Sequence, residues 1–167
     1  MNKQIRIAGV VRESIVDGPG IRFVVFAQGC PHNCAGCHNP DTHDFNGGQW
    51  VDIDVIIAEM KKNPLLDGIT LSGGEPFEQA EAFGELAEKS GNLGYGVMTY
   101  TGYTYETLLG NKVESWGNLL KRTDILVDGK FQIDQKSLLL KFKGSKNQRI
   151  IDVKKSLLLK NTVLREV

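Results

Sequence analysis

The chain has 167 residues, with 20 basic and 20 acidic side chains and 41% hydrophobic residues. This composition is typical of one globular domain over residues 1–167. The balanced charge gives no general reason to expect a nucleic acid or an anionic membrane as partner. The N-terminus lacks the apolar core of a signal peptide, and no stretch approaches the roughly 18 apolar residues that a membrane span needs. We therefore expect a cytoplasmic protein.

Apolar periodicity predicts alternating strands and helices along the chain. Two strands are expected at residues 5–11 and 21–27, directly before a loop rich in cysteine. The later elements, in chain order, are a helix over 52–62, a strand over 68–71, a helix over 77–89, a strand at 97–98, helical segments over 103–109 and 116–120, a strand over 125–127, and strands at 149–151 and 162–164 around a helix over 152–160. Arg22 is interpreted as a solvated strand residue.

Strand–helix alternation indicates an α/β fold with a parallel sheet and right-handed crossovers. A closed eightfold barrel needs at least about 200 residues, so we expect a partial, open β/α barrel. Sites in such sheets gather at the carboxyl ends of the strands. The cysteine loop and the segments 73–75, 100–101 and 128–130 each follow a predicted strand and should share one rim.

All three cysteines, Cys30, Cys34 and Cys37, lie in the stretch GCPHNCAGCHNP. Three cysteines cannot all pair within one chain, and thiols stay reduced in the cytoplasm, so a disulfide framework is disfavoured. An iron–sulfur cluster accepts such a run because each iron takes one thiolate. Three thiolates would leave one iron of a four-iron cluster without a cysteine, and an open coordination position is typical of catalytic metals.

Zinc remains the alternative at this point. The three cysteines and one further ligand would make a closed tetrahedral site. The candidates for that fourth ligand are His32, His38 and His43. Structural zinc sites usually take ligands from two separated pairs, whereas here the thiols come from one short run.

Residues 16–41 carry a family resemblance, in VDGPGIR and in the spacing C-x-x-x-C-x-x-CHNPD. This stretch resembles the radical S-adenosylmethionine superfamily and, within it, the activating enzymes of glycyl-radical enzymes. The segment GGEP at 73–76 resembles that superfamily's methionine-binding turn. The stretches YTGYTYETLL (100–109), DILVDGKF (124–131) and GSKNQRIIDV (144–153) resemble the subgroup that activates anaerobic ribonucleoside-triphosphate reductase. Gly36 stands where the wider superfamily often has an aromatic residue, and reductase activators commonly have glycine there.

The resemblance implies one 4Fe–4S cluster held by the three cysteines, with S-adenosylmethionine bound at the fourth iron in a partial barrel of the radical S-adenosylmethionine type. It implies reductive cleavage of that cofactor to a 5′-deoxyadenosyl radical, which removes hydrogen from a glycine of the reductase's large chain. A strongly reducing flavodoxin or ferredoxin-type donor is expected. The rival interpretations are an activating enzyme of another glycyl-radical enzyme, such as pyruvate formate-lyase, and a non-enzymatic zinc-binding module.

Candidate cofactor contacts come from the cysteine loop and the strand ends, namely Gly36, Cys37, His38, Gly73, Gly74, Glu75, Thr99, Asp128 and Lys130. The backbone of 36–38 is expected near the adenine, and the Gly73 and Gly74 carbonyls near the cofactor's ammonium group. Ordinary turn and cap chemistry explains the threonines at 99 and 101 and Asp128 about as well. It also explains the GGEP turn taken alone, but next to the cysteine motif the functional interpretation of that turn is favoured. Gly74→Val is expected to weaken cofactor binding while the cluster persists. Trp116 and Phe131 are assigned to the core or an interface.

Overall fold

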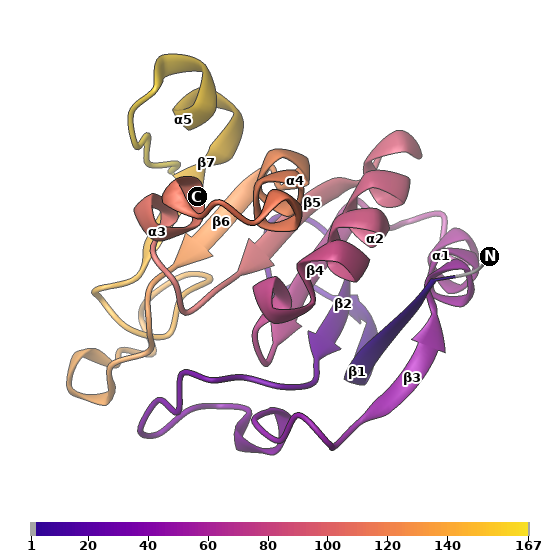
Figure 1. The fold of residues 1–167 in the computed structure, drawn as a ribbon, viewed down its shortest axis with the longest axis horizontal. Coiled ribbons are helices and arrows are strands. Elements are labelled where there is room, and N and C mark those ends of the chain that lie inside the picture. Colours follow the sequence, from indigo (N-terminus) through magenta and orange to yellow (C-terminus); the bar gives the residue numbers. More distant parts are fainter. Residues whose placement is uncertain (1–2, 167) are drawn as a thin grey trace.

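The computed structural model describes residues 3–166 as an α/β fold around one open seven-stranded sheet (Figure 1). The strands are β1 (Gln4–Ser14), β2 (Arg22–Ala27), β3 (Gln49–Asp52), β4 (Gly68–Gly73), β5 (Gly96–Tyr100), β6 (Ile125–Asp128) and β7 (Arg149–Asp152). The helices are α1 (Ile53–Lys61), α2 (Ala80–Asn92), α3 (Tyr105–Gly110), α4 (Glu114–Arg122) and α5 (Val153–Leu159), with 3₁₀ turns at Pro40–Thr42, Pro76–Gln79 and Ile133–Gln135.

The sheet is mixed, in the order β3-β1-β2-β4-β5-β6-β7. Strands β2, β4, β5 and β6 pair in parallel, whereas β1 pairs antiparallel with both β2 and β3, and β7 pairs antiparallel with β6. The expected parallel sheet is therefore confirmed for the four central strands and wrong at both edges. A parallel pair needs a long crossover, usually a helix, and no α-helix lies between β1 and β2 or between β6 and β7 in the described chain.

Strand residues alternate between a face covered by helices and a face that carries the candidate site. Phe23, Ile69 and Val97 belong to the main core cluster, together with apolar side chains of α1, α2 and α4. The opposite face has a smaller apolar cluster of Met98, Ile125, Val127 and Ile150. Both α1 and α4 pack against α2, and Figure 1 shows α2 and α4 in front of the central strands.

Most predicted elements are present with shifted ends. Strand β3 was not predicted, and the strand expected at 162–164 is reduced to an isolated bridge between Ile151 and Leu164. None of the helices described between residues 3 and 166 has the length and apolar content to cross a membrane.

Arg22 is 4% exposed, so the interpretation as a solvated residue is wrong. Its guanidinium donates to Thr70 Oγ1 at 2.8 Å and to the carbonyls of Ile69, Gly96 and Pro19 at 2.9, 2.8 and 3.0 Å. Burial lowers the pKa of Arg22 from its ordinary value. The side chain thus ties the start of three parallel strands to the turn that precedes β2.

Candidate functional site

The two ends of the cysteine loop are fastened to each other by backbone hydrogen bonds. Gly29 N donates to Thr42 O at 2.6 Å, and Cys30 N donates to His43 O at 3.2 Å. The buried Gln28 amide donates to two main-chain carbonyls of the returning segment, at 3.0 and 2.6 Å. The loop is therefore anchored at the carboxyl end of β2, independently of anything bound to its thiols.

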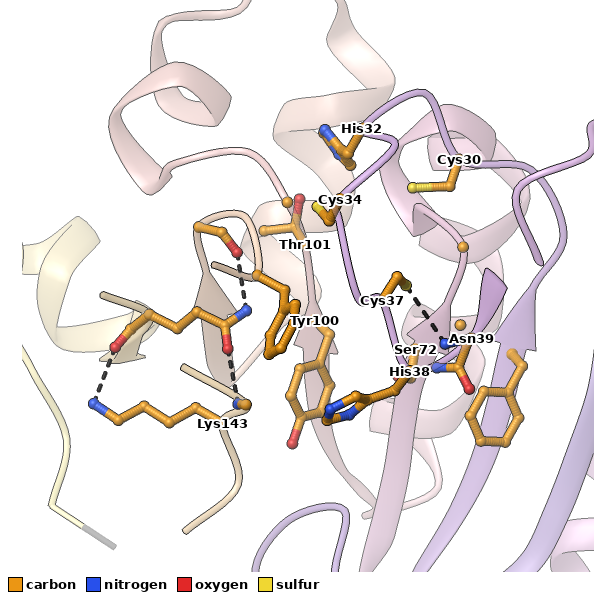
Figure 2. Close-up of a pocket in the computed structure, with 18 of the residues that line it drawn as sticks. Cys30, His32, Cys34, Cys37, His38, Asn39, Ser72, Tyr100, Thr101 and Lys143 are labelled. Atoms are coloured by element: carbon orange, nitrogen blue, oxygen red, sulfur yellow. Dashed lines mark hydrogen bonds between the residues drawn. The ribbon is translucent and has the colours of Figure 1, made fainter. Parts of the chain in front are cut away.

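Cys30, Cys34 and Cys37 are free, half-buried thiols that line one pocket of about 480 Å³. Figure 2 shows the three side chains on a single loop, next to Thr101 and Ser72 at the ends of neighbouring strands. The Asn39 amide donates to Cys37 Sγ at 3.4 Å. Within the described residues, no three side chains of His, Cys, Asp or Glu are grouped to hold a single metal ion.

Burial raises the pKa of the Cys30 thiol to about 11, and the neighbouring Glu75 carboxylate and the other two thiols act in the same direction. Metal ligands must be deprotonated, so an incoming iron ion has to displace this proton. Without metal the site therefore holds Cys30 as a neutral thiol at physiological pH.

Glu75 is completely buried and accepts from several elements at once. Thr101 Oγ1 lies 2.9 and 3.0 Å from its two carboxylate oxygens, and the amides of Gly102 and Phe77 donate to it at 2.8 and 3.1 Å. His32 Nε2, from the cysteine loop, lies 2.5 Å from Glu75 Oε1. The carboxylate predicted to contact a cofactor thus joins the ends of β4 and β5 to the cysteine loop.

Gly73 and Gly74 line the pocket as predicted, and both are tightly packed against β2 and its extension. A Cβ at Gly73, whose φ is +88°, would lie 2.6 Å from Ala27 N. A Cβ at Gly74 would lie 2.4 Å from Gly29 O. Glycine at 73–74 is therefore required by the close approach of the backbone that leads into the cysteine loop.

In the cysteine loop, Gly36 has a φ of +72°, and a Cβ there would lie 2.5 Å from Ile133 Cδ1. His38 lines the pocket, with its ring centroid 5.1 Å from that of Phe131. Phe131 also lines the pocket, although the sequence assigned it to the core or an interface. Trp116 fits that assignment, since it packs on the buried Phe77.

Five of the nine predicted contacts lie outside the residues that line the pocket. Two of them, Gly36 and Glu75, are described above, and the other three are Thr99, Asp128 and Lys130. Thr99 is buried and its hydroxyl bonds to Thr123 Oγ1 at 2.9 Å. Asp128 is buried and accepts from Arg149 Nε at 3.0 Å. Lys130 is exposed. Their side chains have other surroundings in this structure, and a role at the cofactor stays a prediction for all three.

Sequence reasoning placed Tyr100 on the shared rim but missed the loop between β6 and β7, which forms a wall of the pocket together with Tyr100. The Tyr100 hydroxyl donates to Phe142 O at 2.6 Å, and both residues line the pocket with Lys143 and Ser72. Burial raises the pKa of Tyr100 from its ordinary value. The alternation of side chains along β5 could have indicated where Tyr100 points, because Tyr100 lies on the same face of the strand as Met98.

Fold and site together define the class of protein: an α/β protein whose run of thiols faces an open pocket at the carboxyl ends of parallel strands, where each thiol can bind a separate iron. The family comparison agrees. Residues 16–151 match the model described as a 4Fe-4S single cluster domain, and the chain belongs to this family.

Curated relatives are activating proteins. The chain is 37% identical over 145 residues to the anaerobic ribonucleoside-triphosphate reductase-activating protein of Vibrio cholerae, covering 81% of this chain and 90% of that protein. It is 31% identical over 141 residues to the protein of the same name from Enterobacteria phage T4, covering 81% and 86%. It is 35% identical over 128 residues to the pyruvate formate-lyase-activating enzyme of Clostridium pasteurianum, covering 73% of this chain and 50% of that enzyme.

Proposed function

We propose that this chain is a radical S-adenosylmethionine enzyme that generates a glycyl radical on anaerobic ribonucleoside-triphosphate reductase. One observation carries the proposal: three free thiols from a single loop line the same pocket as the glycine turn that ends β4. The relatives named for this activation, matched over most of their length, support the choice of partner.

The residues present fit a 4Fe–4S cluster. Cys30, Cys34 and Cys37 supply three thiols, and the Asn39 amide points at one of the sulfurs, as is common for cluster-binding cysteines. When bound, the cluster and S-adenosylmethionine supply an electron and a 5′-deoxyadenosyl radical that takes hydrogen from a glycine. The protein's own contribution is to orient the cofactor and to exclude water and stray hydrogen donors.

We assign cofactor binding first to predicted residues that line the pocket. Gly73 and Gly74 bring strand-end backbone to it, and His38 with Phe131 offers an aromatic wall for the adenine. Gly36 lies in the same loop and remains part of the proposal through its backbone. Glu75 is buried and hydrogen-bonded to groups of the protein itself. We therefore assign it to holding the cysteine loop against the strand ends, not to contact with the cofactor.

The finer fold description, a partial barrel of the radical S-adenosylmethionine type, belongs to the same proposal. Its support is the parallel order β2-β4-β5-β6 with the site at the carboxyl ends. The proposed electron donor is a flavodoxin or ferredoxin-type protein of the cytoplasm, because iron–sulfur potentials at the reducing end reach about −700 mV.

The test is the glycyl radical itself. The protein is reconstituted anaerobically with iron and sulfide, reduced, and mixed with S-adenosylmethionine and the reductase large chain. Electron paramagnetic resonance should then detect the glycyl signal. Cys34→Ala should abolish both this signal and 5′-deoxyadenosine formation while the far-ultraviolet circular dichroism is retained. A colourless protein that binds one zinc ion instead of iron would overturn the proposal.

A second candidate, activation of pyruvate formate-lyase, is favoured by the 35% identity to an enzyme with that name, of which the chain spans half. The same experiment separates the two. Pyruvate formate-lyase replaces the reductase in a parallel reaction, and the partner that acquires the glycyl signal identifies the substrate.

A further inference from the structure

His32 lies between two of the cysteines, yet its ring is engaged by the rest of the fold. Its side chain is 5% exposed, and its Nε2 lies 2.5 Å from the fully buried Glu75 Oε1. A contact between an imidazole and a buried carboxylate is worth more than a surface pair, because water cannot easily replace the lost partner in a buried site. Glu75 keeps its bonds from Thr101, Gly102 and Phe77 when the imidazole is removed, so the loss falls on the attachment of the cysteine loop.

Two neighbouring residues hold the ring from the side of β5. A Cβ at Gly102 would lie 2.4 Å from His32 Cδ2, so the imidazole packs directly on the Gly102 backbone. The Tyr103 ring meets it edge-on, with centroids 4.5 Å apart, and the Tyr103 hydroxyl donates to Glu78 at 2.5 Å. The Gly102 amide also donates to Glu75.

These contacts attach the stretch between Cys30 and Cys34, inside the loop whose ends are already tied, to the ends of β4 and β5. The attachment reaches the strand β4 through Glu75 and the segment after β5 through Gly102. It therefore fixes where the thiols stand relative to the glycine turn at 73–74.

We propose that His32 is a positioning residue that, through Glu75 and Gly102, sets the place of the cysteine loop over the strand ends before any cluster is bound. The proposal rests on the proposed function for its effect on S-adenosylmethionine, but not for its effect on the loop. It assigns His32 to the carboxylate and not to a metal ion.

The first experiment uses the metal-free full chain and needs no catalytic activity. Amide hydrogen exchange of residues 30–38 is compared in the wild type, His32→Ala and Gly102→Ala. Both variants should exchange at least about tenfold faster there, because a hydrogen bond to a buried charge contributes a factor of that size. Exchange in β4 and β5 should be unchanged. Asp54→Asn, which breaks the exposed pair with Lys89 at 2.8 Å, is the matched control and should leave the loop unaffected.

The second experiment combines the substitutions. Gly102→Ala acts through a clash between the new Cβ and the imidazole, so it should add nothing further in a His32→Ala background. His32→Gln, which keeps a nitrogen donor for Glu75, should recover part of the protection. Additive effects of the two alanine substitutions, wild-type exchange in both, or faster exchange spread over the whole protein would each overturn the proposal.

The third experiment uses the reconstituted protein. His32→Ala and Gly102→Ala should retain iron but bind S-adenosylmethionine about tenfold more weakly. The binding is measured from the change that the cofactor causes in the electron paramagnetic resonance spectrum of the reduced cluster. Wild-type affinity in both variants overturns the positioning role while leaving the proposed function intact. If the wild type itself shows no response to S-adenosylmethionine, the proposed function fails, and the exchange result still decides the role of His32.

Discussion

Replacing Gly74 by alanine places a Cβ 2.4 Å from Gly29 O and 2.8 Å from Ala27 O. Cβ contacts under 3.0 Å are essentially never seen and become ordinary from 3.4 Å, so one of these backbone segments must move by about 0.6–1.0 Å. Both obstacles are backbone, and both accept hydrogen bonds from the turn, Ala27 O from Gly74 N and Gly29 O from Glu75 N, each at 2.8 Å. The strain therefore falls on the segment that leads directly to Cys30.

Overpacking of this kind costs about 1–3 kcal/mol, which lowers the unfolding temperature of a chain of this size by roughly 2–12 °C. Gly74→Ala should lose iron content and cofactor affinity together, because the displaced segment carries the first thiol. The geometry favours this joint loss over the selective loss of cofactor binding expected from the sequence for Gly74→Val.

Three measurements test the effects: iron per chain after reconstitution, calorimetric affinity for S-adenosylmethionine, and thermal unfolding of the metal-free protein. Gly117→Ala in α4, with nothing within 4 Å of the new Cβ, is the control. A Gly74→Ala protein with wild-type iron and unfolding temperature would refute the steric argument.

Three further outcomes follow from burial and hydrogen bonding. Arg22→Met should lower the free energy of unfolding by about 2 kcal/mol, because four acceptors lose their donor. Urea unfolding measures this loss, and a value below about 0.5 kcal/mol would contradict the prediction. The raised pKa of Cys30, about 11 against an ordinary 9.0, stabilises the metal-free protein fully below pH 9, and this contribution is lost as the pH rises towards 11. Cys30→Ser should lose less stability than the wild type across that window, and an equal loss speaks against the shift. Tyr100→Phe removes the bond to Phe142 O and should speed proteolysis at 136–142, with Tyr95→Phe as control; unchanged cleavage would show that the bond does not hold the loop.

The order of strands and helices was predictable from periodicity, whereas the edges of the sheet were not. Residues 49–52, QWVD, form β3 with two exposed and two half-buried residues. Such a short strand carries no clear alternation, and its position is set by pairing with β1 after the cysteine loop returns. The antiparallel edges likewise depend on connections that contain no crossover helix.

The cysteines and Gly73–Gly74 were correctly predicted to lie near one another because they follow adjacent parallel strands. Thr99 and Asp128 also lie near strand ends, but their side chains are on the face of the sheet opposite the pocket. Leu126 faces the helices, so Asp128, two residues later, faces them as well and accepts from Tyr105 N at the start of α3. Period-two alternation applied to the last residues of each strand would have separated Thr99 from Tyr100.

Arg22 and Glu75 show the limit of sequence reasoning more generally. A charged residue is seldom fully buried, and neither position has a local pattern that marks it. Their burial depends on partners far away in the sequence, such as Thr70, 48 residues from Arg22, and His32, 43 residues from Glu75. Only the assembled strands bring those partners together.

The fastening of the loop ends by Gln28 and by the Gly29–Thr42 bond has a consequence for damage and repair. Iron–sulfur clusters are destroyed by oxidants, and a scaffold that relied on iron for its own closure would come apart with them. Here the closure is made by amides and carbonyls, and closing so short a loop costs little entropy. A chain stripped of its metal therefore keeps the frame into which new iron can be delivered.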